Sequence, residues 1–222
     1  MNEMPLLRVS GLRSDVGSRT LWQDIELELG PGDSIALRGV SGSGKSTLLR
    51  CLGGIERPAH GSVRIVGVDV QRGGANARAL RRDVVGFVMQ DHAIVPEWSV
   101  EQNLAVVRPT GVPRTARLER IGAALLAVGL GGRGRQRAGA LSGGEQQRIA
   151  VARLLVQRPR VVLADEPTAS LDTESATRVR SALDLLRSNG AAVVVATHDE
   201  ALSGWAGRVL HLGGCGARRG PQ

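Results

Sequence analysis

A glycine-rich segment with the pattern G-x-x-x-x-G-K-S runs from Gly39 to Ser46. Glycines let backbone N–H groups close around phosphate oxygens, and a helix that begins here points the positive end of its dipole at the same anion. A lysine in this position can reach the β- and γ-phosphates of a nucleotide, and the hydroxyl that follows can ligate Mg²⁺. The segment predicts a phosphate-binding site formed by Gly39, Val40, Ser41, Gly42, Ser43, Gly44, Lys45, Ser46 and Thr47.

The amino-acid composition singles out Lys45, which is the only lysine among 29 lysine and arginine residues. An ammonium group is a compact point charge on a thin stem, whereas a guanidinium group is a wide planar fork. A chain that uses arginine everywhere else keeps lysine here for a specific reason. A narrow phosphate pocket would supply that reason.

Two adjacent carboxylates, Asp165 and Glu166, end the apolar run 161–164. Acidic groups at the end of a buried strand are costly unless they meet a cation or a reacting group. Asp165 would hold Mg²⁺ directly or through water, and Glu166 would polarise an attacking water as general base. The alternative is that both residues only cap the helix that follows.

A second segment suited to an anion opens a helix with the sequence LSGGEQQR, residues 141–148. Ser142 is a natural N-cap, and Gly143 and Gly144 permit close backbone approach. The alternative is a capped helix with no ligand. If one chain cannot bring Ser142 and Lys45 to the same phosphate, a partner chain must supply one of them.

The hydrophobic pattern places these segments on an alternating series of strands and helices. Apolar runs predict strands at 34–38, 84–89, 161–164 and 191–196, and alternation predicts antiparallel strands at 7–9 and 25–29 with a hairpin that bends at Gly67. We expect helices from residue 47, after Ser99, around 118–128, and over 145–157 and 173–188. Apolar strands that alternate with helices indicate a parallel sheet covered on both faces.

The expected fold is therefore an α/β P-loop NTPase with a mainly parallel core sheet, an N-terminal antiparallel β subdomain and an inserted α-helical subdomain. We expect one domain over residues 1–222. Its nucleotide-binding core, with the antiparallel subdomain, would cover 1–90 and 156–212, and its helical subdomain 91–155. Residues 213–222 look like a frayed tail.

Bulk composition excludes several classes of protein. Hydrophobic residues make up 42% and charged residues 23%, which is typical of a globular protein. The net charge of +8 is spread over scattered arginines without interleaved aromatics, so we expect no nucleic-acid partner. No apolar run is long enough to span a bilayer, no secretory signal is present, and the two cysteines form no disulfide or metal pattern. We therefore expect the reducing cytoplasm, with Cys51 as a small core residue.

The order of the motifs resembles an ABC-transporter ATPase subunit over nearly the whole chain. The phosphate loop is followed by Gln90, LSGGEQQR, the segment ADEPT (164–168), the segment 170–172 and Thr197-His198-Asp199. The segment LSGGEQ separates this family from other phosphate-loop enzymes. The form ADEPT and the short length are similar to the lipoprotein-release, macrolide-export and cell-division group.

The resemblance implies a head-to-tail homodimer with two ATP molecules between the subunits. Each ATP would lie on one phosphate loop and be covered by Ser142, Gly143, Gly144 and Glu145 of the other chain, with Asp172 bridging the subunits. The implied catalytic residues are Glu166, His198, Gln90 and Lys45, and the implied Mg²⁺ ligands are Ser46, Gln90 and Asp165.

The chain departs from the family at the adenine contact. The family usually stacks adenine on an early aromatic residue, but this chain has no tyrosine, and the corresponding position falls near Val16. Trp22 could substitute, although it fits a core residue better. A smaller departure is Ala138, where relatives often have proline.

The resemblance favours a subunit that energises a membrane transporter for export or membrane extraction. An integral membrane permease would dock near the Gln90 loop and the helical subdomain, on the inner face of the cell membrane. One alternative is an ATPase that transmits force to a cell-division or wall-remodelling partner without solute transport. A soluble DNA-repair or translation ATPase fits less well because long coiled-coil insertions and a second such domain are missing, and a phosphoryl transferase would not explain LSGGEQ.

Overall fold

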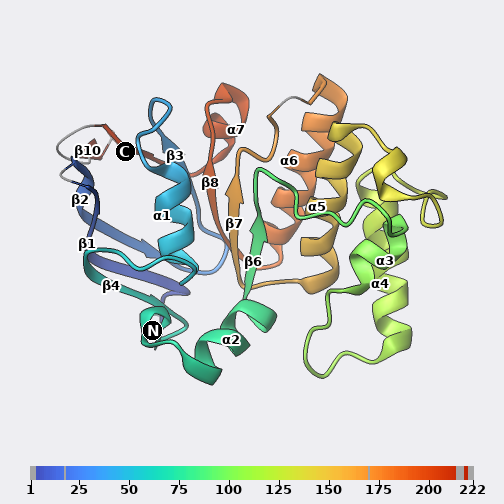
Figure 1. Ribbon diagram of the computed structural model, residues 1–222, viewed down its shortest axis with the longest axis horizontal. Coiled ribbons are helices and arrows are strands. Elements are labelled where there is room, and N and C mark those ends of the chain that lie inside the picture. Colours follow the sequence, from blue (N-terminus) through green and yellow to red (C-terminus); the bar gives the residue numbers. More distant parts are fainter. Residues whose placement is uncertain (1–3, 18, 170, 214–217, 220–222) are drawn as a thin grey trace.

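The computed structural model describes residues 4–17, 19–169, 171–213 and 218–219 (Figure 1). The strands are β1 (Leu7–Val16), β2 (Arg19–Leu29), β3 (Ser34–Arg38), β4 (His60–Ile65), β5 (Val68–Asp69), β6 (Val85–Val88), β7 (Val161–Asp165), β8 (Ala192–Ala196), β9 (Arg208–His211) and β10 (Arg218–Arg219). The α-helices are α1 (Lys45–Leu52), α2 (Gly74–Asp83), α3 (Val100–Ala105), α4 (Arg114–Ala127), α5 (Gly143–Gln157), α6 (Thr173–Ser188) and α7 (Glu200–Trp205), and short 3₁₀ turns cover Val70–Arg72 and Ala138–Ala140.

The core is a six-stranded sheet in the order β10-β9-β3-β8-β7-β6. Strands β9, β3, β8, β7 and β6 pair in parallel, and β10 pairs with β9 in the antiparallel direction. Every residue of β7 and β8 is buried, as a parallel sheet covered on both faces requires. The expected α/β class is confirmed.

Alternate residues of β7 belong to two different hydrophobic clusters. Val162 and Ala164 pack in the cluster that contains the apolar residues of α4, α5 and α6. Val161 and Leu163 pack in the cluster that contains the buried residues of α1 and of the antiparallel strands. The period-two pattern of the strand thus divides the core into two layers, one on each face of the sheet.

The antiparallel sheet has the order β2-β1-β4-β5 and pairs Leu7 with both Leu29 and Ile65. β1 and β2 are much longer than the expected 7–9 and 25–29. Only part of each strand is buried and apolar. Beyond that part, polar residues continue the hydrogen-bonded pairing, with shifts in register. The hairpin bend at Gly67 is confirmed, with φ of 76°.

A helical lobe of α3, α4 and the first half of α5 lies to one side of the sheet (Figure 1). Ser99 caps α3 through a reciprocal capping box with Gln102, as the sequence predicts. α5 runs on to Gln157 and reaches the core sheet and α6, so the proposed boundary at residue 155 falls inside this helix. The subdomain boundaries therefore stay a proposal.

The expectation of a frayed tail from residue 213 is wrong for Arg218 and Arg219. These two residues form β10, which pairs with Leu210 and His211 of β9. An edge strand offers unpaired N–H and C=O groups, and the returning chain uses them. The rest of the segment after Gly213 lies outside the described residues.

Candidate nucleotide-binding site

The predicted site residues follow four neighbouring strands of the parallel sheet. Leu37 and Asp165 both lie opposite Ala196, and Val88 lies opposite Ala164. Since the strands are parallel and about 4.8 Å apart, the segments that follow them emerge at one edge. In strand order these are the phosphate loop after β3, Thr197-His198 after β8, Asp165-Glu166 at β7 and Gln90 after β6. Such a carboxyl edge is where open α/β sheets bind ligands.

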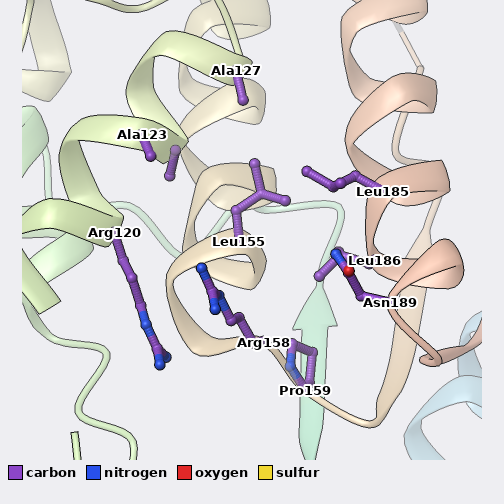
Figure 2. A pocket seen from close by; sticks show the side chains of 10 residues that line it. Arg120, Ala123, Ala127, Leu155, Arg158, Pro159, Leu185, Leu186 and Asn189 are labelled. Atoms are coloured by element: carbon purple, nitrogen blue, oxygen red, sulfur yellow. The ribbon is translucent and has the colours of Figure 1, made fainter. Parts of the chain in front are cut away.

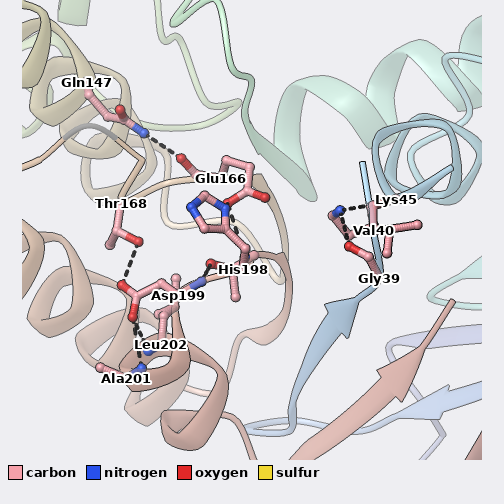
Figure 3. A network of polar contacts seen from close by, with 11 residues as sticks. Gly39, Val40, Lys45, Gln147, Glu166, Thr168, His198, Asp199, Ala201 and Leu202 are labelled. Atoms are coloured by element: carbon pink, nitrogen blue, oxygen red, sulfur yellow. Dashed lines mark hydrogen bonds and ion pairs between the residues drawn. The ribbon is translucent and has the colours of Figure 1, made fainter. Parts of the chain in front are cut away.

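The phosphate loop turns between β3 and α1 at two left-handed glycines. Gly42 has φ of 76° and Gly44 has φ of 89°. α1 begins at Lys45 and has no acidic residue in its first turn, so its positive end is not neutralised locally. Lys45 Nζ donates to Gly39 O at 2.8 Å and to Val40 O at 3.4 Å (Figure 3). The ammonium group is thus held over the loop itself.

The loop fits an anion on structural grounds. Ser43 Oγ is a buried oxygen with no hydrogen-bond partner among the described residues. A Cβ added to Gly39 would collide with the Leu212 carbonyl and the Ser43 side chain, whereas one added to Gly42 would meet nothing within 4 Å. The loop is therefore fixed on its inner side and open outward, as a cradle for phosphate requires.

Trp22 contacts the phosphate loop through a hydrogen bond to Gly44. Its side chain is 2% exposed, and its Nε1 donates to Gly44 O at 3.2 Å. The interpretation of Trp22 as a core residue is confirmed, and an adenine ring could not stack on it. Val16, at the end of β1, is 60% exposed and remains the predicted adenine contact.

Glu166 and His198 form a close pair at the ends of β7 and β8 (Figure 3). Glu166 Oε2 lies 2.9 Å from His198 Nδ1 and also accepts from His198 N at 3.4 Å. A carboxylate only accepts hydrogen bonds, so Nδ1 carries the proton and Nε2 lies on the far side of the ring. Glu166 is largely buried, whereas the His198 side chain is 75% exposed. The carboxylate thus orients the imidazole toward the open edge.

Glu166 adopts a strained backbone, with φ of 48°. A left-handed conformation costs a non-glycine residue roughly 1–2 kcal/mol. Its N–H donates to Ala196 O at 2.9 Å, and its carbonyl accepts from Ala169 N at 3.1 Å and from Gln147 Nε2 at 3.0 Å. These three bonds hold the conformation and aim the side chain away from β7.

Two of the predicted Mg²⁺ ligands, Asp165 and Ser46, lie at the carboxyl edge of the sheet. Asp165 is 5% exposed at the end of β7, and Ser46 is half-buried in the first turn of α1. Within the described ranges, no group of three or more His, Cys, Asp or Glu side chains gathers. Mg²⁺ in phosphate sites keeps waters and uses one or two protein oxygens with the phosphates, so a dedicated cage is not required.

The helix start at LSGGEQ is pre-organised. Ser142 Oγ accepts from Glu145 N at 3.3 Å, and Glu145 Oε2 accepts from Ser142 N at 2.9 Å. Arg133 forms an ion pair with Glu145. The pKa of Glu145 is lowered, chiefly by the Ser142 N–H bond and, against the opposing effect of burial, by Arg133. A Cβ on Gly143 would meet nothing within 4 Å, so this helix start is open to a neighbour.

One chain does not bring its two phosphate-seeking elements together. In Figure 1, α5 is separated from α1 by strands β7 and β6. Asp172 caps α6 by accepting from Ser175 N at 2.8 Å and Oγ at 2.9 Å, and Leu171 lies against Gly144. Ser170, part of the predicted motif 170–172, lies outside the described residues.

The family model described as ABC transporter matches residues 22–169, about two thirds of the chain. The chain belongs to the ABC transporter family. The resemblance seen in the motif order is thereby confirmed, and membership makes the chain an ATP hydrolase.

Two relatives of this ABC protein illustrate the range of its similarity. It is 44% identical over 190 residues to the lipoprotein-releasing system ATP-binding protein LolD 1 of Rhodospirillum rubrum, with 84% of each chain covered. It is 42% identical over 216 residues to the macrolide export ATP-binding/permease protein MacB 1/2 of Paracoccus denitrificans, covering 94% of this chain and 32% of that protein. The chain thus spans about a third of the length of the macrolide export relative.

A solved structure supports the ABC fold. The ATP-binding cassette MJ0796, in a dimeric post-hydrolysis state bound to ADP and Pi, superposes with a TM-score of 0.84 at 27% identity. The alignment covers 96% of this chain and 98% of that one. The described part of the ABC chain includes no helix both long and apolar enough to cross a membrane.

A pocket of about 450 Å³ lies outside this site, between the C-terminal halves of α4, α5 and α6 (Figure 2). Arg158 and Pro159, which line it, precede β7, and Asn189 precedes β8. The pocket is therefore at the amino edge of the sheet, opposite Glu166. It takes no part in binding at the carboxyl edge of the ABC module.

Sequence reasoning missed three residues that the structure joins to the site. Gln147 binds the Glu166 carbonyl, Arg133 holds Glu145, and Thr168 Oγ1 donates to Asp199 Oδ2 at 3.0 Å (Figure 3). Burial opposes ionisation of Asp199, but the Thr168 and backbone N–H bonds outweigh it and lower its pKa. Thr168 lies in ADEPT and Gln147 in LSGGEQQR, so their motif positions were the available signal.

Proposed function

We propose that this chain is the ATP-binding and ATP-hydrolysing subunit that energises a membrane transporter through an ATP-sandwiched homodimer, in export or extraction from the membrane. The observation that carries the proposal is the separation of two phosphate-seeking elements on one chain. Lys45 and Glu166 lie along one sheet edge, while Ser142 opens a helix beyond β6. A second copy, turned head to tail, would bring its Ser142 over the Lys45 of the first.

Within this proposal each edge residue has a role. Lys45, now bonded to Gly39 O and Val40 O, would exchange these carbonyls for β- and γ-phosphate oxygens. Glu166 would accept the proton of the attacking water, and His198 would steady that water and the γ-phosphate. Mg²⁺ would neutralise charge on the phosphates, held by Ser46, Asp165 and Gln90. Thr47 and Val16 would contact the nucleotide, and Asp172 would bridge the subunits.

A dimer is supported by the solved relative, which is dimeric with ADP and Pi. The helix start at Ser142 adds support because the Glu145 carboxylate is already bonded within the chain, to Ser142 N and to Arg133. The N–H groups of the open first turn are thus left for a ligand outside the chain. Two such contacts, related by a twofold axis, would close both sites together.

The membrane partner would dock beside the Gln90 loop and the helical lobe, on the cytoplasmic side of the cell membrane. The support is an exposed apolar patch in this region, formed by Trp98 (41% exposed) and Val106 (47% exposed), which line one surface hollow. Two of its relatives are named for lipoprotein release and macrolide export, which favours a transporter over a force-transmitting ATPase without cargo.

The test is the Glu166→Gln variant with MgATP. The substitution keeps the size of the side chain and removes the base, so ATP should bind, turnover should fall to background and the closed dimer should accumulate. Size-exclusion chromatography with light scattering measures the dimer, and phosphate release measures turnover. Lys45→Ala in the same background should abolish nucleotide binding and the dimer. A Glu166→Gln protein that binds ATP and stays monomeric would refute the sandwich.

A further inference from the structure

One buried amide connects the peptide of Glu166 to the loop that follows β6. Gln147, in the second turn of α5, is 3% exposed. Its Nε2 donates to Glu166 O at 3.0 Å, and its Oε1 lies 3.2 Å from His92 Nε2. His92 and Gln147 are 55 positions apart, and the fold brings them together between the helical lobe and the sheet.

The chemistry of the three groups fixes the direction of each bond. A peptide carbonyl can only accept, so the Gln147 nitrogen must face Glu166 and its oxygen must face His92. His92 Nε2 must therefore carry a proton to complete the chain. The result is a directed series of hydrogen bonds from His92 through the buried Gln147 side chain to Glu166, and bonds in such a series reinforce each other.

Both ends of this series are strained. Glu166 has φ of 48°, and His92 and Ala93 have φ of 56° and 46°. Non-glycine residues persist in this region only where their surroundings hold them, and such residues cluster at functional sites. The same helix holds the second strained segment, because Arg153 Nη1 donates to His92 O at 3.1 Å and to Ala93 O at 2.7 Å.

A simple packing role would not require this arrangement. Gln157, at the other end of α5, shows such a role: its Nε2 donates to Arg82 O at 3.0 Å and Val85 O at 2.9 Å, both in the α2–β6 region. Gln157 thus stabilises the fold and makes no bond to the described residues of the candidate nucleotide-binding site. Gln147 uses the same amide chemistry, but its two partners are the catalytic peptide and the loop beside the proposed docking patch.

We propose that Gln147 is a positioning residue, which sets the orientation of Glu166 according to the position of loop 91–95. When the loop holds His92 in place, Gln147 is held against Glu166 O, and the carboxylate is aimed at the water. When a partner displaces the loop, Gln147 is released and Glu166 loses one of its constraints. This inference rests on the proposed role of Glu166 as general base.

The first experiment compares Gln147→Met with Gln157→Met. Methionine keeps the length and volume of glutamine but removes both polar groups. Gln147→Met should lower kcat on the order of 10- to 100-fold, because small misplacement of a catalytic group has effects of this size. The KM for ATP and the affinity for nucleotide should stay within about 3-fold, since Lys45 and its loop are untouched. Gln157→Met should shift the melting temperature and leave kcat unchanged.

The second experiment uses His92→Ala, which alters a half-buried loop residue and leaves the core intact. It should lower kcat with unchanged KM. The double variant His92→Ala/Gln147→Met should be no slower than Gln147→Met, because both changes break one series of bonds. Wild-type kcat in either single variant, or a multiplicative loss in the double variant, would overturn the proposal. An equal loss of kcat in Gln157→Met would also overturn it, by showing a general effect of weakened packing.

These outcomes are separable from those for the proposed function. If Glu166→Gln keeps full turnover, Glu166 is not the base and the proposed function fails. If Glu166→Gln is inactive and Gln147→Met is fully active, only the positioning role fails.

Discussion

Gly143 offers a sharp test of the two-chain site because its own chain leaves room for a side chain. It is the first residue of α5, and an added Cβ would meet nothing within 4 Å. An aspartate in the first turn of a helix interacts favourably with the dipole by about 0.3–1 kcal/mol. Gly143→Asp should therefore keep or slightly raise the free energy of unfolding of the isolated chain.

In the closed dimer the same carboxylate would face the terminal phosphate on the partner's phosphate loop. Two unit charges 4 Å apart repel by about 4 kcal/mol at an effective dielectric constant of 20. Since each 1.4 kcal/mol is a factor of ten, the dimer should weaken by roughly a thousandfold for each such pair. ATP binding to a single chain should not change, because α5, which begins at Gly143, is separated from α1 and its phosphate loop by strands β7 and β6 (Figure 1).

The measurement places Gly143→Asp in the Glu166→Gln background and follows ATP-dependent dimerisation by light scattering, with turnover measured in the wild-type background. Gly122→Asp is a matched control, since Gly122 is an exposed residue of α4 whose added Cβ also meets nothing within 4 Å. The control should dimerise and turn over normally. Normal dimerisation and turnover of Gly143→Asp would refute the reasoning, because no phosphate could then lie against this helix start.

Two further predictions follow from local contacts. His198→Ala should lower the single-turnover rate on the order of a hundredfold, while ATP affinity should change little because Lys45 and the phosphate loop are unchanged. A variant with the wild-type rate would contradict the pairing with Glu166. Asp83 has its pKa lowered from 3.8 to about 2, chiefly by the Arg82 side chain. A lowered folded-state pKa means that the unfolded chain binds the proton first, so this stabilisation is complete above pH 4 and lost as pH falls toward 2. Urea unfolding across that window should show a shallower pH slope in Asp83→Asn, and an unchanged slope would exclude this carboxylate as the source.

Where local rules agree with the fold, the elements could be predicted from the sequence. α6 spans Thr173–Ser188 as expected, because Asp172 caps its start and Gly190 stops it with φ of 88°. Ser142 caps α5 as expected, and Ser99 forms with Gln102 the capping box that their spacing indicates. Short-range hydrogen bonds decide such features, so no knowledge of distant contacts was needed.

α2 was not predicted because its signals are weak or contrary. It follows Gly73 and begins at Gly74, both left-handed, and it buries only Ala77 and Leu80. Glycines at a helix start usually indicate a loop. α7 and β9 were missed for a related reason: each is short, and its place is fixed by packing on the sheet edge. Leu118, an apolar residue within the helix expected around 118–128, is 42% exposed.

The candidate site also has a part that could be predicted from the sequence and a part that could not. The phosphate loop and the carboxylate pair could be predicted because their chemistry lies within a few consecutive residues. The bonds of Gln147 to His92 and Glu166 could not, because they depend on how α5 crosses the sheet. The contact of Trp22 with Gly44, across 22 positions, likewise depends on the packing of the antiparallel sheet against α1.

Because Lys45 is the only lysine, cleavage after lysine can report on the opening of the start of α1. A protease that cuts after lysine has one peptide bond to attack in these 222 residues, and that bond lies in the first turn of α1. Helical backbone must open before a protease can bind it, so the cutting rate measures how often the start of α1 unfolds. Any molecule that grips Lys45 should slow the cut, and no label or engineered reporter is needed to see it.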